Sequence, residues 1–297
     1  MLQQTRVDVA RDYYRRWLRA FPTARALARA PYRRVLKLWE GLGYYARARN
    51  LHRAAPLIGG VFQDRSPDKF AGLLALPGIG RYTAGAIASI AFEERRPAVD
   101  GNVARVLARV FDLCADVTRP VTQRNFGTLA AALLPRRGCG EFNQALMELG
   151  ALICTPTSPR CPVCPLRGAC RARALQTVGR LPNRGPRPAA QSVLRTVAFV
   201  RRDGRVLVRR RPAAGLLAGL WELPPLDRRQ FRARAEVLTL RHTITNRRIR
   251  LRVVACDPRG AFPAEGRWRW ITTRGLKRLA FSAAHRRALE RLLSAQH

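Results

Sequence analysis

Four of the seven cysteines lie in one short segment of the chain, spaced C-x6-C-x2-C-x5-C. They are Cys154, Cys161, Cys164 and Cys170. Four soft thiolates this close in sequence can ligate one metal centre, and four thiolates are the usual ligands of a [4Fe–4S] cluster. The prolines beside them indicate a stiff loop, because proline fixes φ and donates no hydrogen bond. We therefore expect a [4Fe–4S] cluster, with a zinc ion as the alternative.

A glycine-rich segment forms a second candidate site. Pro77-Gly78-Ile79-Gly80-Arg81 separates a helix that we expect to begin at Ser66-Pro67 from another over residues 83–92. Glycine permits a sharp turn and leaves backbone N–H groups exposed at a helix N-terminus, where they can bind a phosphate without reading base sequence. The alternative is an ordinary corner between two helices.

Asp100 is a candidate catalytic carboxylate. It opens Asp100-Gly101-Asn102-Val103, just before a predicted helix, where an aspartate often serves only as the N-cap. Beside a basic helical hairpin, however, a carboxylate can stabilise the positive charge that develops on a sugar as its glycosidic bond breaks. We favour this second interpretation.

The charge of the chain indicates a polyanionic partner. Lys and Arg number 56 against 19 Asp and Glu, a net charge of +37. Such an excess predicts nucleic acid binding by counterion release, although a solvated basic surface is the alternative. We find no membrane-spanning run, no signal peptide and no disulfide framework, so we expect a cytoplasmic, bacterial-type protein associated with the nucleoid and without a membrane partner.

The elements that must position these residues fall into two parts. Residues 1–175 have a helical pattern, for example the face formed by Val9, Tyr13, Trp17 and Phe21. Residues 176–192 are rich in breakers and predict a linker. Residues 193–297 predict a small α+β domain, with a hairpin turn at Asp203-Gly204, an alternating strand around residues 249–253 and a closing helix over 283–293.

Together these motifs resemble one protein family. Pro77 to Arg81 followed by Asp100 to Val103 is similar to the helix-hairpin-helix base-excision DNA glycosylases, and the cysteine spacing resembles their iron–sulfur branch. Within that branch, Met1-Leu2-Gln3-Gln4-Thr5 and residues 41–50 resemble the MutY-type adenine DNA glycosylases. The resemblance implies a mainly α glycosylase domain over 1–175, with a cluster loop at 154–170. It also implies a monomer that acts on double-stranded DNA with A:8-oxoguanine or A:G mispairs.

The resemblance also assigns roles to single residues. Asp100 would stabilise the oxocarbenium ion and Asn102 would orient the site. Bifunctional relatives carry at position 82 a lysine that attacks the sugar; Tyr82 cannot form that Schiff base, which implies a monofunctional enzyme. Gln4 and Tyr44 would hold the base stack open. Four residues of the hairpin would contact the DNA backbone: Pro77, Gly78, Gly80 and Arg81.

The second part carries its own resemblance. Gly215 to Pro224 resembles the start of the Nudix-like domain of the adenine DNA glycosylases, which inspects 8-oxoguanine. We find no Glu-rich signature for Mg²⁺ and expect no pyrophosphate hydrolysis. The inspecting loop matches Arg241 to Asn246, where Ile244-Thr245-Asn246 replaces the common Phe-Ser-His. Thr245 keeps a hydroxyl for the damaged base, whereas Asn246 offers an amide in place of an imidazole.

The general acid of the family does not lie within this sequence. The resemblance places a glutamate two residues before the position of Met1. We expect a trimmed or misassigned start, and the alternative is a protein that binds lesions without catalysis. A glycosylase/AP lyase like endonuclease III, acting on oxidised pyrimidines, is a further alternative, which Tyr82 and the second domain oppose.

Overall fold

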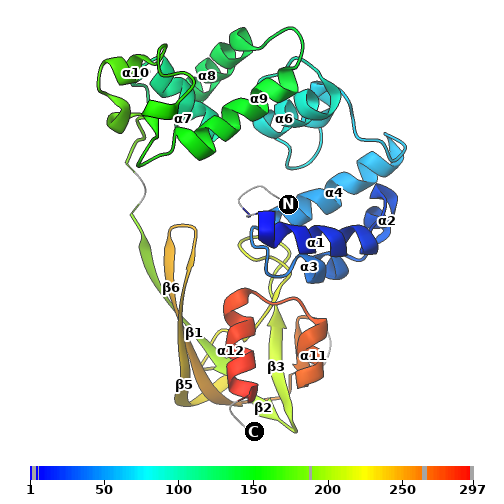
Figure 1. The fold of residues 1–297 in the computed structure, drawn as a ribbon. Helices are drawn as coiled ribbons and strands as arrows, with labels where there is room; N and C mark the ends of the chain where they lie inside the picture. The colour runs from blue at the N-terminus through cyan, green and yellow to red at the C-terminus, as the bar shows by residue number, and fades with distance from the viewer. Residues whose placement is uncertain (2–4, 6, 187–188, 263–265, 295–297) are drawn as a thin grey trace. The chain divides into compact units, whose positions relative to one another are not determined.

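The computed structural model of the chain describes residues 1, 5, 7–186, 189–262 and 266–294 (Figure 1). Contacts divide it into two compact units, Met1–Pro56 with Pro188–His297, and Leu57–Arg187. The domain borders that the sequence suggests at residues 175 and 192 stay a prediction. Among the described helices, none is both long and apolar enough to cross a membrane.

The unit Leu57–Arg187 is helical, and its core lies among α7, α8 and α9. Buried Val106, Leu107, Phe126 and Leu146 meet there. Two helix starts follow local chemistry, since Asp100 caps α7 and Pro120 occupies the first turn of α8. Its elements are α5 Phe70–Leu74, α6 Arg81–Phe92, α7 Gly101–Val110, α8 Pro120–Leu133, α9 Cys139–Glu148, η1 Leu149–Ile153, η2 Cys161–Val163, α10 Arg171–Ala174 and η3 Val178–Arg180, with α4 Ala46–Gly60 crossing into it from the other unit.

The helix expected to begin at Ser66-Pro67 begins instead at Phe70. The carboxylate of Glu94 accepts the backbone N–H of Phe70 at 2.6 Å, which satisfies a free donor of the first turn there. The following helix starts at Arg81, two residues before the expected Thr83. Both differences arise at helix ends, where a distant side chain or a glycine turn decides the boundary.

The other unit begins with α1 Val7–Ala20, α2 Ala24–Arg29 and α3 Tyr32–Trp39. The predicted apolar face of α1 is confirmed at Trp17 and Phe21, which are buried with Trp39. The Trp17 ring lies edge-on to both partners, with ring centroids 5.0 Å from Phe21 and 5.3 Å from Trp39. Val9, at 41% exposed, lies outside this core.

The same unit contains the predicted α+β domain. Its two sheets have the orders β1-β6-β5 and β2-β3-β4, and β7 also pairs with β3. Helix α12 lies beside β5 (Figure 1). Its Ala288 and Leu289 belong to the core that includes Leu251 and Val253 of β6. The elements are β1 Gln191–Phe199, β2 Arg201–Arg202, β3 Arg205–Arg210, β4 Trp221–Glu222, β5 Phe231–Ile244, β6 Arg247–Pro258, β7 Trp268–Ile271, α11 Thr273–Arg278 and α12 Ala283–Ser294.

The hairpin turn predicted at Asp203-Gly204 is confirmed, because it joins the antiparallel strands β2 and β3. The longer strand before this turn, β1, does not pair with β3. β1 pairs in parallel with β6, for example Val197 with Val253, and so lies in the other sheet. The alternation predicted for residues 249–253 is also confirmed, since Ile249, Leu251 and Val253 are buried.

Glu40 ties the N-terminal helices of this unit to its C-terminal helix. One carboxylate oxygen accepts the backbone N–H of Phe281 at 2.8 Å and Nε of Arg286 at 2.6 Å. The other oxygen accepts Nζ of Lys37 at 2.6 Å. Leu220, from the loop before β4, is buried among the aromatic residues of α1 and α3. Residues from both ends of the chain therefore share one core.

Candidate active site and cysteine-lined pocket

The Asp100 carboxylate is held at the N-terminus of α7 by three hydrogen bonds. Oδ1 accepts the backbone N–H groups of Asn102 and Val103, both at 2.8 Å. Oδ2 accepts the side-chain amide of Asn102 at 3.0 Å. These donors, at the positive end of the helix dipole, fix the position and orientation of the carboxylate. Asp100 is thus an N-cap and at the same time a fixed, half-buried negative charge.

Asn102 connects Asp100 to Arg105, one turn further along α7. The amide oxygen of Asn102 accepts Nη2 of Arg105 at 2.9 Å, which fixes the orientation of its amide. The same Nη2 donates to the carbonyl of Gly150 at 2.7 Å, and Nε donates to the carbonyl of Cys154 at 2.7 Å. Burial lowers the pKa of the Arg105 guanidinium. Arg105 therefore joins the Asp100 network to the segment that carries the first cysteine.

Asn143 of α9 holds the extended segment that leads to Asp100. Its amide nitrogen donates to Oγ of Ser89 and to the carbonyl of Arg96, both at 2.9 Å. Its amide oxygen accepts the backbone N–H of Ala98 at 3.2 Å. Gly140 allows the close approach of α9 to α6, since an added Cβ would lie 2.7 Å from the carbonyl oxygen of Ser89. These contacts fix the backbone two residues before the carboxylate.

The glycine-rich segment is a tight turn between α5 and α6. Gly78 has φ of +82°, a conformation that favours glycine. Gly80 is the N-cap of α6 and gives it no side-chain cap, and open space surrounds the position where its Cβ would be. Arg81 is exposed at the first position of α6. An exposed, uncapped helix N-terminus beside an arginine can bind a phosphate oxygen.

Tyr82 lies close to Asp100. Partial burial raises the pKa of the Tyr82 hydroxyl, and the negative charge of the nearby Asp100 raises it further. The side chain is 37% exposed, so it is open to solvent on one side. The structure thus brings Tyr82 close to Asp100, whose carboxylate also accepts the side-chain amide of Asn102.

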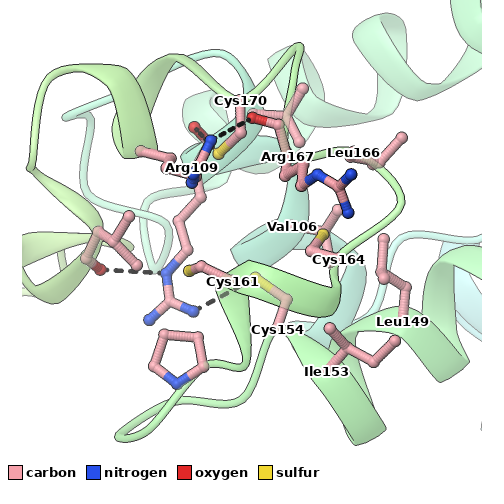
Figure 2. Close-up of a pocket in the computed structure, with 14 residues that line it drawn as sticks. Val106, Arg109, Leu149, Ile153, Cys154, Cys161, Cys164, Leu166, Arg167 and Cys170 are labelled. Atoms are coloured by element: carbon pink, nitrogen blue, oxygen red, sulfur yellow. Dashed lines mark hydrogen bonds between the residues drawn. The ribbon is translucent and has the colours of Figure 1, made fainter.

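The four cysteines of the predicted metal site line one pocket. Figure 2 shows the sulfur atoms of Cys154, Cys161, Cys164 and Cys170 around it, together with Arg109. The remaining lining is mostly apolar, including Val106 of α7, Leu149 and Ile153. Burial raises the pKa of the Cys164 thiol, and the other three thiols raise it further.

Arg109 is a residue of this pocket that the sequence did not reveal. It is only 1% exposed, and its Nη1 donates to Sγ of Cys154 at 3.3 Å and to the carbonyl of Thr155 at 2.8 Å (Figure 2). Its Nε donates to the carbonyl of Leu181 at 3.0 Å. The spacing of Arg105 and Arg109, four residues apart on one face of a helix, was the signal available in the sequence.

The donor set of this pocket consists of sulfur atoms. One zinc ion needs four sulfurs at about 2.3 Å from one point. Among the described residues, no group of three or more His, Cys, Asp or Glu side chains is gathered in a way that could hold one metal ion. The four thiols line a common pocket to which, in the part of the chain that the structure describes, no carboxylate and no histidine contributes. Four thiolates are the usual ligand set of an iron–sulfur cluster, so the residues present fit that group.

Tyr44 follows a glycine turn in the other unit. Its φ is +45° and its side chain is 54% exposed. The guanidinium of Arg47 lies 5.5 Å from the centre of its ring and 5.4 Å from that of Trp39. An exposed aromatic ring on a rigid turn can enter a base stack. Gln4, its predicted companion, lies outside the described residues.

Thr245 and Asn246 form the tip of the β5–β6 hairpin. Both are exposed, and Thr245 has φ of +55°. The Thr245 hydroxyl donates to the carbonyl of Ile244 at 2.7 Å, and its Oγ1 lies 3.4 Å from Oδ1 of Asn246. Both side chains offer polar atoms to solvent at a hairpin tip. They belong to the same unit as Tyr44, whereas Asp100 and the cysteines belong to the other.

Two family models match this chain. Residues 1–130 match the HhH-GPD superfamily base excision DNA repair protein, and residues 196–291 match the NUDIX domain. A solved structure of a thermostable thymine-DNA glycosylase is similar with a TM-score of 0.53 and 26% identity, covering 59% of this chain and 80% of that one. These matches confirm the predicted fold class, a helix-hairpin-helix glycosylase fold followed by a Nudix-like domain.

Curated relatives resemble the chain across both parts. Adenine DNA glycosylase of Rattus norvegicus is 40% identical over 270 residues, which cover 75% of this chain and 52% of that protein. Adenine DNA glycosylase of Arabidopsis thaliana is 39% identical over 257 residues, which cover 75% and 41%. The chain thus spans about half the length of the curated relatives it matches. On these findings, the chain contains an HhH-GPD base excision DNA repair domain matched over residues 1–130 and a NUDIX domain matched over residues 196–291.

Proposed function

We propose that this protein is a monofunctional adenine DNA glycosylase. It would hydrolyse the N-glycosidic bond of adenine paired with 8-oxoguanine or guanine in double-stranded DNA, acting as a monomer. The observation that carries the proposal is the Asp100 carboxylate, fixed by three hydrogen bonds close to Tyr82 and the hairpin. The relatives named adenine DNA glycosylase support the choice of base.

Asp100 supplies the electrostatic part of the reaction. As the bond to adenine breaks, positive charge develops on the deoxyribose, and a fixed carboxylate stabilises it without reorganising. Asn102 keeps Oδ2 of Asp100 in place through its amide. Tyr82 has no amine for a Schiff base, so water completes the reaction and leaves an abasic site.

The remaining predicted residues bind and open the duplex. The turn at Pro77, Gly78, Gly80 and Arg81 binds backbone phosphates through its N–H groups and the arginine. Tyr44, with Gln4, fills the gap left by the extruded adenine, which repays part of the few kcal/mol that flipping costs. Thr245 and Asn246 offer a hydroxyl and an amide to the 8-oxoguanine on the opposite strand.

The four cysteines would hold a [4Fe–4S] cluster. When bound, the cluster supplies iron–thiolate bonds that hold the loop 154–170 together, and Arg109 donates to one of the ligand sulfurs. Replacing Cys164 with serine should abolish the broad visible absorbance and the iron content. Cys114, which is exposed and outside the pocket, is the matched control. Retention of iron by the Cys164 variant would contradict the ligand assignment.

The test of function is the release of adenine from an A:8-oxoguanine duplex in a single turnover. The assay compares the chain with an extended version that carries a glutamate at the position where the resemblance places the general acid. In the active version, Asp100→Asn should slow release by at least about a hundredfold. Asp116→Asn is the matched control, since Asp116 also accepts a backbone N–H two residues on, from Thr118.

Three outcomes separate the proposal from its alternatives. An undiminished rate in the Asp100 variant would remove the carboxylate from the mechanism. Tight binding of the mispaired duplex without base release, even with the glutamate restored, would indicate a lesion-binding protein. A protein–DNA adduct trapped by borohydride would indicate a lyase.

A further inference from the structure

A large pocket lies in the unit formed by Met1–Pro56 and Pro188–His297, and its lining includes none of the site residues assigned above. Its volume is about 860 Å³. One wall is the first turns of α3, and the other is formed by the ends of β3 and α11 together with β4 and β7. The volume lies within the range of about 300–1,000 Å³ found for sites that bind small molecules.

The lining of this pocket is strongly cationic. Three basic residues come from α3 and three from the second wall, and among the residues that the structure describes no aspartate or glutamate lines the pocket. We call it the cationic pocket and define it by these residues: Arg33, Arg34, Lys37, Arg210, Arg269 and Arg278. Like charges that converge on one space repel one another, and the repulsion falls when an anion enters.

Few of these charges are neutralised by the protein. Lys37 pairs with Glu40 at 2.6 Å. Arg269 lies over the ring of Trp221 at 5.4 Å, which leaves its charge uncompensated. Within the described part of the chain, no carboxylate pairs with Arg33, Arg210 or Arg278. All three side chains are exposed, so they are free to change rotamer and contact a bound ligand.

The backbone adds to this preference for anions. Helix α3 begins in the pocket wall, has no side-chain cap at Pro31 and no acidic residue in its first turn. The N-terminus of a helix carries a partial positive charge and unpaired N–H groups. Gly219 lines the pocket at φ of +76°, and an added Cβ there would lie 3.2 Å from Leu36 Cδ1. A larger residue would therefore narrow the pocket beside α3.

We propose that the cationic pocket binds an anion with several phosphate groups. Even without Lys37, which Glu40 neutralises, five arginines line the pocket, and these exceed what one phosphate of about two negative charges can neutralise, so the ligand carries a run of phosphates. Either the backbone of a nucleic acid strand or a free polyphosphate has this chemistry. The site does not depend on the proposed glycosylase activity, because its residues are distinct from those of the hairpin, Asp100 and the β5–β6 tip.

The test measures binding of inorganic tripolyphosphate by titration calorimetry at physiological ionic strength. The pocket variant combines Arg33→Gln, Arg210→Gln and Arg278→Gln. The control combines three exposed arginines outside the pocket, Arg205→Gln, Arg228→Gln and Arg229→Gln, and so loses the same charge. Loss of three ion pairs should weaken binding by about tenfold or more in the pocket variant, and by less than about threefold in the control.

Equal weakening in both variants, or no measurable binding by the unsubstituted chain, would overturn the proposal. A second measurement uses Trp221, which lines the pocket. Tripolyphosphate should change the tryptophan fluorescence of the unsubstituted chain and leave that of the Trp221→Phe variant unchanged. Circular dichroism checks that all variants are folded. Competition with an undamaged duplex oligonucleotide then separates the sources: displacement identifies the DNA backbone, and its absence identifies a free polyphosphate.

Discussion

Arg105 offers a direct test of how the Asp100 network and the cysteine segment are held together. It is 4% exposed and donates to the carbonyls of Gly150 and Cys154 at 2.7 Å and to Asn102 at 2.9 Å. Glutamine is shorter and reaches at most one of these acceptors. Hydrogen bonds to a charged group contribute about 1.5–3 kcal/mol each, and a buried acceptor left unpaired costs about 1–3 kcal/mol.

With two acceptors left unpaired, we expect Arg105→Gln to lower the free energy of unfolding by about 3–5 kcal/mol. That is a large part of the roughly 5–15 kcal/mol that stabilises a domain. Urea unfolding followed by far-UV circular dichroism measures the change. Arg124→Gln, at an exposed arginine of α8, is the matched control and should change stability by less than about 0.5 kcal/mol. A loss below about 1 kcal/mol in the Arg105 variant would refute the reasoning.

Three further predictions concern other parts of the chain. Gly150→Ala should destabilise the fold by about 1–3 kcal/mol, because the new Cβ would lie 2.7 Å from Cβ of Asn102, whereas Gly127→Ala on α8, with no atom within 4 Å, should be neutral or stabilising. Burial lowers the pKa of His285 to about 4, so the neutral ring should contribute roughly 3 kcal/mol above pH 6.5 that is lost as the pH falls from 6.5 to 4. Tyr44→Ala should weaken binding of mispaired DNA by about tenfold through lost stacking, whereas Tyr14→Ala, equally exposed, should not.

Each of these has a measurement that can contradict it. Equal stability of the Gly150 and Gly127 variants in urea would show that the helix moves aside without cost. An unchanged slope of stability against pH in His285→Gln would show that another group titrates over that range. Equal affinities of the Tyr44 and Tyr14 variants for the mispaired duplex would remove Tyr44 from the DNA-binding surface.

The sequence predicts best where the chemistry is local. Asp100 was interpreted as a catalytic carboxylate with N-capping as the alternative, and the structure shows that it caps α7. That geometry leaves its catalytic role to be tested, since one carboxylate can serve both purposes. The turn at Asp203-Gly204 and the alternation along β6 were also predicted, because a two-residue turn and a two-residue period are visible in a few letters.

Long-range pairing was not visible in the same way. The strand Gln191–Phe199 pairs in parallel with β6, which lies more than fifty residues later in the chain. No local sequence pattern identifies β6 as its partner. The start of α5 was placed too early because the Glu94 carboxylate that holds Phe70 comes from a distant segment. The sequence gives the tendency of each element, whereas the tertiary contacts decide its limits and its neighbours.

The arginines of α7 show a second limit. In a chain of net charge +37, arginine suggests a surface that meets DNA. Arg105 and Arg109 are buried instead, and bind backbone carbonyls of the cysteine segment. Composition cannot separate these structural cations from solvent-facing ones, because the distinction depends on which carbonyls the fold leaves without partners.

The π-helical turn η1, Leu149–Ile153, has a consequence for the length of this segment. Cys154 donates its backbone N–H to the carbonyl of Leu149, five residues back, at 2.7 Å, so the turn holds one residue more than an α-helical turn. Each residue advances an α-helix by about 100°. Deleting one residue here would restore the regular helix and rotate Cys154 by about a quarter of a turn relative to the other three cysteines. The extra residue thus sets the direction in which the Cys154 side chain leaves the axis of α9.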